Sequence, residues 1–330
     1  MTALRTPSAK RRTLLALPLS LVLPGTASGQ QGWPARPLRM VVPFPPGGIA
    51  DIAARAIGAE MAKDFGQAVI IENRPGAGGN LGADIVAKSA LDGQTLLYAV
   101  ASTLTANPHR SGSKLPFDPV RDLAPVSETV MGGMVLVVRP EFEASNLKGW
   151  LARLKAQPGR LTYASYGNGS FPHLNMELLK SMTGTHVVHI PYRGAAPAIQ
   201  DLLGGQVDMM FDQSATAIPQ VRAAKLKALA VNTPQRLAAL PDVLTVAESL
   251  KGFDGSGWQG IWVPAGTPPA VVERLHQSVA KALSVPEVRK RFTDAGLEVV
   301  GSTSEQARAK VERESAKWKD VIGFARIKAD

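Results

Sequence analysis

Residues 38–51 read LRMVVPFPPGGIAD, and this stretch decides the fold class. Residues 38–44 are a short apolar run of the kind that forms a buried strand, and the Pro-Pro-Gly-Gly sequence at 45–48 ends it. Apolar residues then return with helical spacing, at Ile52, Ala56, Ile57 and Met61. A strand, a glycine-rich turn and a helix in this order predict an α/β protein.

The same alternation continues along the chain. It predicts strands at 68–72 and 95–100 with a helix at 82–89, and it restarts after residue 133. There it predicts strands at 134–138, 161–164, 187–190, 207–211 and 226–231, with helices at 147–156, 173–182, 196–203 and 218–223. Three helical stretches follow a last apolar run at 260–263, at 268–283, 286–295 and 304–322.

This order predicts a two-lobed α/β fold of the periplasmic-binding-protein kind (type II-like). Each lobe has a mostly parallel or mixed sheet with helices on both faces, and the ligand cleft lies between the lobes. A length of 330 residues suits two domains. We expect lobe 1 to comprise residues 30–130 and 256–330, and lobe 2 residues 131–255. The chain is expected to cross between them in glycine-rich segments near 126–133 and 253–260.

Composition excludes several classes of function. The chain has no cysteine, so it has no disulfide, thiolate zinc site or cysteine nucleophile. Its formal charge is +10, but the Lys and Arg residues are scattered and form no basic run interleaved with aromatics. We therefore expect no nucleic-acid partner, and no cofactor or metal is predicted.

The N-terminus has the pattern of a secretory signal peptide. Four basic residues, Arg5, Lys10, Arg11 and Arg12, precede an apolar run at 13–24 that is too short to span a bilayer. Small residues follow, and Ala27 and Gly29 fit a cleavage site, so residues 1–29 are expected to be removed. The alternatives are cleavage after Ala27 and retention of the segment as a membrane anchor. Export to the periplasm follows, and the mature chain would carry a charge of +6 after losing four positive and no negative charges.

Two loops share a feature that suits an anion. Residues 43–51 and 165–170 (SYGNGS) each lie between a predicted strand and a predicted helix, and each is rich in glycine. Backbone N–H groups at a helix N-terminus lack intrahelical partners, and the helix dipole adds positive potential there. Such loops can bind a carboxylate or phosphate, although the same sequences also serve as plain strand–helix turns.

These residues resemble a known family. The runs PFPPGGIAD (43–51), VIIENRPGAGGNLGADIVAKSALDGQTLL (69–97), YASYGNGSFPHLNMELL (163–179) and HIPYRGAAPAIQDLLGGQVDMMFD (189–212) resemble the solute-binding proteins of tripartite tricarboxylate transporters, the Bug or TctC-like receptors. The resemblance extends over nearly the whole mature chain. Ile49 and Ala50 stand where the family often has small or hydroxyl residues.

The resemblance implies a monomeric, non-enzymatic receptor that takes a small carboxylate to the membrane subunits of a transporter. The ligand would be a dicarboxylate, tricarboxylate, acidic amino acid or aromatic acid, held by backbone amides of the two loops. The expected ligand-binding residues are Phe44, Pro45, Gly47, Gly48, Ile49, Ala50, Asp51, Ser102, Ser165, Tyr166, Gly167, Asn168, Gly169, Ser170, His173, Tyr192, Asp212 and Gln213.

Some of these residues have two interpretations. Asp51 can contact the ligand or complement the dipole of its own helix. His173 can cap the helix after the second loop or approach the cleft. Asp212 can accept a hydrogen bond from a ligand amine or hydroxyl, since a carboxylate would repel an anionic ligand group. Arg193 is the rival to the loop amides as the carboxylate's partner.

The main alternative function is a secreted α/β hydrolase with a Ser/His site in the interlobe cleft. Ser165 or Ser170 would be the nucleophile, with His173 and Asp212 as partners, although no G-x-S-x-G elbow occurs. A dinucleotide site at 76–82 is disfavoured because Leu81 stands where the third glycine is required. His186 and His189 are interpreted as structural histidines because a strand would point them to opposite sides.

Overall fold

The computed structural model describes residues 33–110, 114–144 and 146–328, together with Thr2. Residues 34–330 form one compact unit. The expected signal peptide falls, apart from Thr2, outside the described residues. No helix in the described part of the chain combines the length and the apolar character needed to cross a bilayer.

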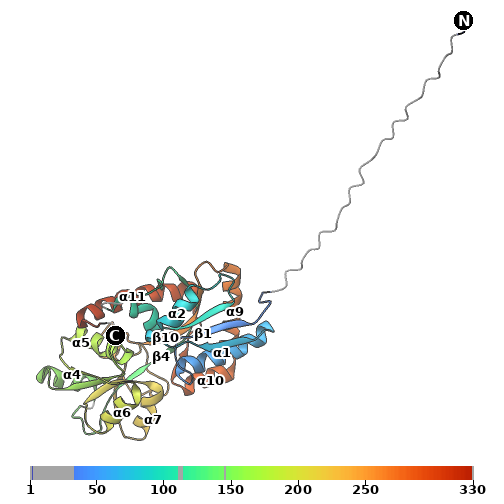
Figure 1. The fold of residues 1–330 in the computed structure, drawn as a ribbon. Helices are drawn as coiled ribbons and strands as arrows, with labels where there is room; N and C mark the ends of the chain where they lie inside the picture. Colours follow the sequence, from blue (N-terminus) through green and yellow to red (C-terminus); the bar gives the residue numbers. More distant parts are fainter. Residues whose placement is uncertain (1, 3–32, 111–113, 145, 329–330) are drawn as a thin grey trace. The chain divides into compact units, whose positions relative to one another are not determined.

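The first sheet contains six strands in the order β11-β4-β10-β3-β1-β2. Strands β1 (Leu38–Val42), β2 (Val69–Asn73) and β3 (Thr95–Val100) are parallel, whereas β10 (Gly257–Pro264) runs antiparallel to β3 and to β4 (Leu123–Gly132), and β11 (Leu297–Val299) runs antiparallel to β4. Helices α1 (Ile49–Phe65), α2 (Asn80–Ala87), α9 (Pro269–Ser284), α10 (Pro286–Asp294) and α11 (Ser304–Ala325) accompany this sheet (Figure 1). We call this assembly the first lobe.

Both faces of the first sheet are buried. Val41 and Leu97 point into a cluster with Ala83 of α2 and Val311 of α11. Side chains alternate between the faces of a strand, so the neighbouring residues point to the other face. These neighbours, among them Met40 and Leu96, are also fully buried. This explains why the strands are apolar throughout rather than alternating.

The second sheet contains five strands in the order β7-β6-β8-β5-β9. Strand β6 (Thr162–Ser165) is parallel to β7 (Val188–Pro191) and β8 (Met209–Gln213), and β5 (Met134–Val138) is antiparallel to β8 and β9 (Lys227–Val231). Helices α4 (Leu147–Ala156) and α5 (Phe171–Thr183) contribute to the apolar cluster on one face, and α6 (Ala195–Leu203) and α7 (Ser214–Arg222) to the cluster on the other. We call this assembly the second lobe.

Two chain segments connect the sheets. The first is Gly132-Gly133, where β4 of the first sheet ends and β5 of the second begins. The second follows β9, contains the short helix α8 (Val246–Ser249), and returns to β10. Buried Asn232 links the second segment to the start of β5, next to the first segment: its Oδ1 accepts from the Met134 amide at 2.6 Å, and its Nδ2 donates to the Gly255 carbonyl at 2.5 Å.

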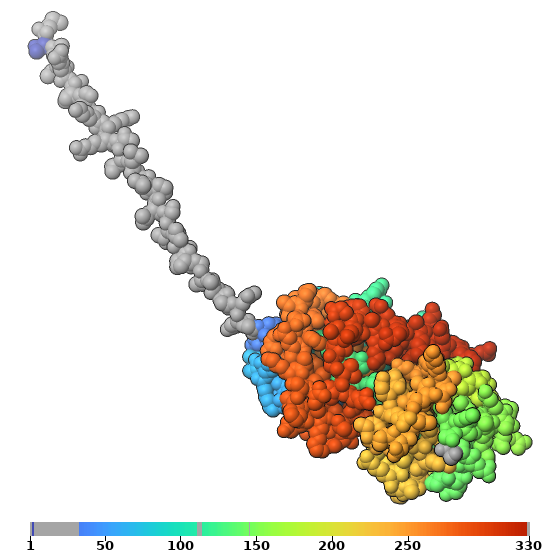
Figure 2. Space-filling model, turned by 180° about the vertical axis from the view of Figure 1, so that it is seen from behind, coloured from blue at the N-terminus to red at the C-terminus, as the bar shows by residue number. Residues whose placement is uncertain are grey.

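Helix α11 contacts both lobes. Its first half packs on β4 and α3 (Ala101–Thr105) of the first lobe, while Trp318, Val321 and Ile322 lie in the same apolar cluster as Leu174 and Leu179 of α5. In Figure 2, the orange and red residues of α9–α11 form the surface beside the yellow and green residues of the second lobe.

The structure confirms the predicted fold class, with two mixed sheets covered by helices. The expected crossing near 126–133 needs one adjustment, because residues 123–132 are a ten-residue strand and only Gly132-Gly133 connects the sheets. Two partners, β10 and β11, hold this strand in place. The lobe limits given above stay a prediction.

Candidate ligand-binding site

A cavity of about 820 Å³ lies where strands of both sheets end. Its first-lobe lining comes from the β1–α1 loop, the 77–80 turn, the start of α3, residues 107 and 110, and strands β10 and β11. Its second-lobe lining comes from the β6–α5 loop, the β8–α7 junction and the start of β5. The carboxyl ends of parallel strands are the usual place for ligands in open α/β sheets, and the volume is within the range of small-molecule sites.

Asp51 holds the first loop, residues 43–51, in place through hydrogen bonds on the side away from the cavity. The carboxylate accepts from the Gly47 amide at 2.9 Å, from Arg55 Nε at 3.0 Å and from Asn73 Nδ2 at 2.9 Å. Burial by itself would raise the pKa of Asp51, but these hydrogen bonds and the Arg55 charge lower it to about 2. Asp51 therefore fixes the loop and the start of α1, and it is not among the cavity-lining residues.

Three amides of the second loop already have acceptors in the loop or in helix α5. The Gly167 amide donates to Ser165 Oγ at 3.1 Å, the Ser170 amide to the Gly167 carbonyl at 3.1 Å, and the Gly169 amide to His173 Nδ1 at 3.0 Å. The amides at the first turns of α1 and α5 have no intrahelical acceptor and can therefore bind a ligand. At the start of α5 the proline at position 172 supplies no N–H.

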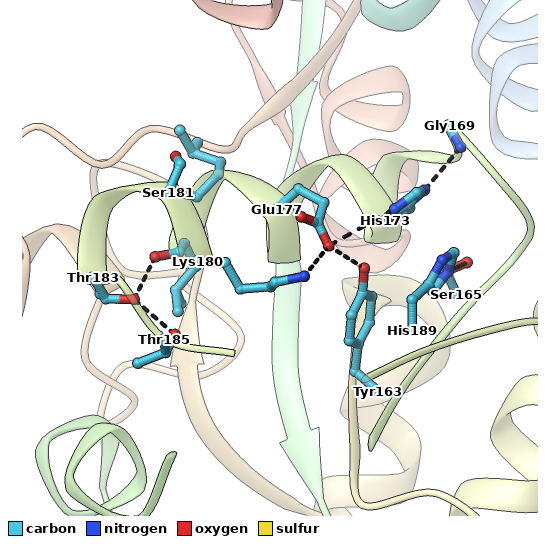
Figure 3. Close-up of polar contacts among 12 residues, drawn as sticks. Tyr163, Ser165, Gly169, His173, Glu177, Lys180, Ser181, Thr183, Thr185 and His189 are labelled. Atoms are coloured by element: carbon cyan, nitrogen blue, oxygen red, sulfur yellow. Dashed lines mark hydrogen bonds and ion pairs between the residues drawn. The ribbon is translucent and has the colours of Figure 1, made fainter. Parts of the chain in front are cut away.

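A buried polar cluster lies beneath this loop (Figure 3). His189 Nε2 is 2.7 Å from Ser165 Oγ, and the rings of His189 and His173 stack with centroids 3.9 Å apart. On the far side, Glu177 Oε1 accepts from Tyr163 Oη and from Lys180 Nζ, each at 2.6 Å. The cluster connects three elements of the second lobe, β6, β7 and α5, directly behind the loop.

Both histidines of the cluster are held neutral. Burial lowers the pKa of His173 to about 4, with further contributions from the charges of Lys180 and Arg110. Burial also lowers the pKa of His189 to about 3, assisted by His173. Neutral His173 keeps Nδ1 available as the acceptor for the Gly169 amide, so its neutral state is part of the loop's geometry.

Tyr166 is held in the cavity wall by Asp212. The phenol donates to Asp212 Oδ1 and accepts from the Gln213 amide at 3.1 Å, and Thr216 Oγ1 donates to the other carboxylate oxygen at 2.8 Å. Asp212 is fully buried, and burial raises its pKa. Its carboxylate thus positions Tyr166 rather than facing the cavity.

The structure brings eleven of the expected residues together in the cavity wall: Phe44, Pro45, Gly48, Ile49, Ala50, Ser102, Tyr166, Asn168, Gly169, Ser170 and Gln213. The other seven lie behind or beside that wall: Gly47, Asp51, Ser165, Gly167, His173, Tyr192 and Asp212. His173 is turned to the Gly169 amide, one residue before the N-cap of α5, and is not among the residues that line the cavity. Tyr192 donates its hydroxyl proton to Asp201 at 2.7 Å.

Several residues of the cavity wall were not expected from the sequence, among them the polar residues Arg110 and Gln259. Among the described residues that line the cavity, Arg110 alone is charged. Gln259 Oε1 and Ser170 Oγ are buried atoms with no hydrogen-bond partner among the described residues. No spacing signal marks Arg110 or Gln259: one follows a short 3₁₀ turn, η2 (Asn107–His109), and the other lies within a strand.

Two α/β lobes joined by two segments, with a cavity at the strand ends of both, define the class of periplasmic binding proteins. Within that class the chain belongs to the family described as the tripartite tricarboxylate transporter family receptor, whose model matches residues 53–326. This is a family of solute-binding receptors, and the resemblance drawn from the sequence motifs is thereby confirmed.

Three similar proteins illustrate the family. The protein BugT of Bordetella pertussis (strain Tohama I) is 36% identical over 291 residues, which cover 88% of this chain and 89% of BugT. A structure of an R. palustris protein with adipate is 31% identical with a TM-score of 0.76, covering 90% of this chain and 99% of that one. The structure of MatC from Rhodopseudomonas palustris with bound malate is 36% identical with a TM-score of 0.73, covering 88% and 100%.

Proposed function

We propose that this chain is an exported receptor that captures a small carboxylate between its lobes and delivers it to the membrane subunits of a tripartite transporter. The observation that carries the proposal is the character of the cavity wall. The N-terminal turns of α1 and α5 border the cavity, and its described lining contains Arg110 and no acidic residue.

This wall suits an anion on physical grounds. The two helices are 17 and 13 residues long, so each has a full dipole with its positive end at the cavity. Asp51 and Asp212, whose charges would repel an anion, are engaged behind the wall with Arg55 and Tyr166. Adipate and malate, the ligands named for the two R. palustris proteins, are both small dicarboxylates, and this supports the same class here.

A binding role is favoured over hydrolysis. Within the described chain, the serine–histidine contact near the cavity is that of Ser165 with His189, and Ser165 is fully buried and outside the lining. His173 contacts the Gly169 amide, and Asp212 contacts Tyr166, so neither is arranged as the partner of a nucleophilic serine. The receptor should release its ligand unchanged.

Export and lobe closure belong to the same proposal. Cleavage near residue 29 would leave a monomeric periplasmic receptor whose lobes, residues 30–130 with 256–330 and residues 131–255, close on the ligand. Intact-mass measurement of the protein from a periplasmic fraction should give a chain that starts near Gln30. A chain that retains Met1 and stays in the cytoplasm would contradict export.

Native mass spectrometry tests the ligand class. Protein purified without denaturation should carry a small molecule that gentle activation releases and that fragments as a carboxylic acid. Calorimetry with that acid should then give saturable binding, and chromatography should recover it unchanged. A neutral or cationic ligand, or conversion of the acid to product, would contradict the proposal.

A further inference from the structure

We propose that Asn232 and Asn175 are positioning residues for ligand binding, because together they anchor the second connecting segment to the second lobe and confine lobe closure to one residue in each segment. The inference rests on the proposed function, since it assumes that the lobes close on a ligand. It adds two fully buried residues that do not line the cavity but control how its two walls meet.

Asn232 uses both its backbone and its side chain at the end of β9. In a regular antiparallel pair the Met134 amide would donate to the Asn232 carbonyl. Here it donates to the side-chain Oδ1 at 2.6 Å, while the Asn232 amide donates to the Met134 carbonyl at 2.9 Å. The Asn232 carbonyl instead accepts from the Gly255 amide at 3.0 Å, and Nδ2 donates to the Gly255 carbonyl at 2.5 Å. Two hydrogen bonds thus hold Gly255 to the second lobe.

Asn175 connects this anchor to the helix that borders the cavity. Its Oδ1 accepts from Asn232 Nδ2 at 2.9 Å, and its own Nδ2 donates to the Phe171 carbonyl at 3.0 Å. Phe171 is the first residue of α5 and lines the cavity. A Cβ on Gly255 would lie 1.8 Å from Asn175 Oδ1, so a side chain at this position would displace the contact. Burial makes each of these hydrogen bonds costly to lose.

The first connecting segment has one residue between its anchors. Gly132 ends β4 in the first sheet and pairs with Gly257 of β10, and Met134 begins β5 in the second sheet. Gly133 lies between them, and a Cβ there would be 2.9 Å from Leu237 Cδ2. A rotation between the sheets therefore passes through Gly133, where the structure has no room for a side chain.

The second segment has the same arrangement because of Asn232. Gly255 is held to the second lobe, and Gly257 is the first residue of β10 in the first sheet. Ser256 lies between them, and its amide and Oγ both donate to Asp254 Oδ1, at 3.0 and 2.6 Å. Without the Asn232 contacts, the unanchored stretch would begin before Gly255, and the two pivots would no longer lie side by side.

Two single-residue pivots at the ends of neighbouring strands define one axis of rotation. Hinge closure around a ligand uses a few residues at the ends of elements in this way. Rotation about one axis brings the first turns of α1 and α5 together along one path. If the second segment is loosened, the fraction of molecules in a binding-competent arrangement falls, and the apparent Kd rises by the same factor.

Binding and lobe distance in two variants test the inference. Asn175→Ala removes the link to α5, and Asn232→Ala removes the whole anchor. Calorimetry with adipate, malate, benzoate and the co-purified acid identifies a carboxylate that the wild type binds. Its Kd should rise about fivefold to tenfold in Asn175→Ala and further in Asn232→Ala.

Spin labels report the distance between the lobes. The chain has no cysteine, so Ala59→Cys in α1 and Gln200→Cys in α6, both at exposed positions, label one site in each lobe. The distribution of distances in the ligand-free protein should be broader in Asn175→Ala and Asn232→Ala than in the wild type. The melting temperature of each variant reports whether it is folded, and Asn175→Ala decides alone if Asn232→Ala does not fold.

Asn146→Ala is the matched control. Asn146 is an exposed asparagine of the second lobe whose Oδ1 accepts from the Gly149 amide and caps α4. Its loss should lower the melting temperature but leave the Kd and the distance distribution unchanged, which separates stability from positioning.

The inference is overturned if folded Asn175→Ala keeps the wild-type Kd or has a distance distribution no broader than that of the wild type. A wild type that binds no carboxylate, while the variants still show broadened distributions, contradicts the proposed function and supports the anchor. A wild type that binds no carboxylate, with unchanged distributions in the variants, overturns both.

Discussion

The imidazole Nδ1 of His173 accepts a hydrogen bond from the amide of Gly169 at 3.0 Å, so a residue in the first turn of α5 fixes the loop that precedes the helix. The amide of Gly169 is thereby unavailable to the ligand, although Gly169 lines the cavity.

His173 should make stability depend on pH. Its pKa is lowered from 6.5 to about 4 in the folded protein, so the unfolded chain binds more protons between these values. The contribution of the neutral His173 ring to the free energy of unfolding is fully present above pH 6.5 and is lost as the pH falls towards 4. In urea unfolding, the loss of stability between pH 7 and pH 4.5 should be smaller in His173→Leu than in the wild type.

His173→Leu should also lower the free energy of unfolding at pH 7 by about 1–3 kcal/mol, because the Gly169 amide loses its acceptor. His186→Gln is the control, since His186 is exposed. An unchanged pH dependence in His173→Leu would show that the folded state does not keep this ring neutral.

Gly169 should be essential for binding. It has φ of +66°, and a Cβ there would meet Arg110 at 2.8 Å. We expect Gly169→Val to weaken binding of the co-purified acid by tenfold or more, on the order of 1.4 kcal/mol. Gly184→Val is the matched control, because Gly184 has φ of +65° and no atom within 4 Å of its Cβ position.

Arg193→Ala should weaken the binding free energy of the co-purified acid by under ~1 kcal/mol, as for a charge at the rim of a site. Calorimetric titration of this variant and of Gly169→Val gives the comparison. Binding that survives Gly169→Val but is abolished by Arg193→Ala would assign the carboxylate to Arg193 instead of to the loops.

Tyr166→Phe should destabilise the second lobe. Removing the hydroxyl takes one donor from the fully buried Asp212 and the acceptor from the Gln213 amide, which should cost about 1–3 kcal/mol. Tyr192→Phe removes a hydroxyl whose partner, Asp201, is only half-buried, and should cost less. Urea denaturation of the two variants gives the comparison, and equal costs would argue against the buried pair.

Asp51→Asn should destabilise the start of α1. The charged form is favoured in the folded protein, with a pKa of about 2 against 3.8, so its contribution is present above pH 3.8 and is lost as the pH falls towards 2. At pH 7 the substitution should cost on the order of 1–3 kcal/mol. Asp294→Asn breaks an exposed pair with Lys290 and should cost under ~1 kcal/mol. Thermal unfolding at pH 7 compares them, and similar losses would contradict the role of Asp51.

Most strands and helices, and with them the two-lobed class, could be predicted from local pattern, although strands β4 and β11 were not. Buried parallel strands such as β3 are continuous apolar runs bounded by turn residues, and amphipathic helices such as α9 repeat their apolar residues with helical spacing; both signals are contained within a dozen residues. The glycine-rich loops at 43–48 and 165–170 were found for the same reason. The family followed from the same motifs.

The tertiary structure decided which residues reach the cavity. Asp51, Asp212 and His173 lie in elements that border the cavity, but their side chains bond to Arg55, Tyr166 and Gly169 and do not line it. Arg110 lies 58 residues from Asn168 in sequence and meets it only through the packing of the two lobes. Local periodicity determines which segments become strands or helices, whereas a contact between distant residues depends on how those segments pack, which no local pattern encodes.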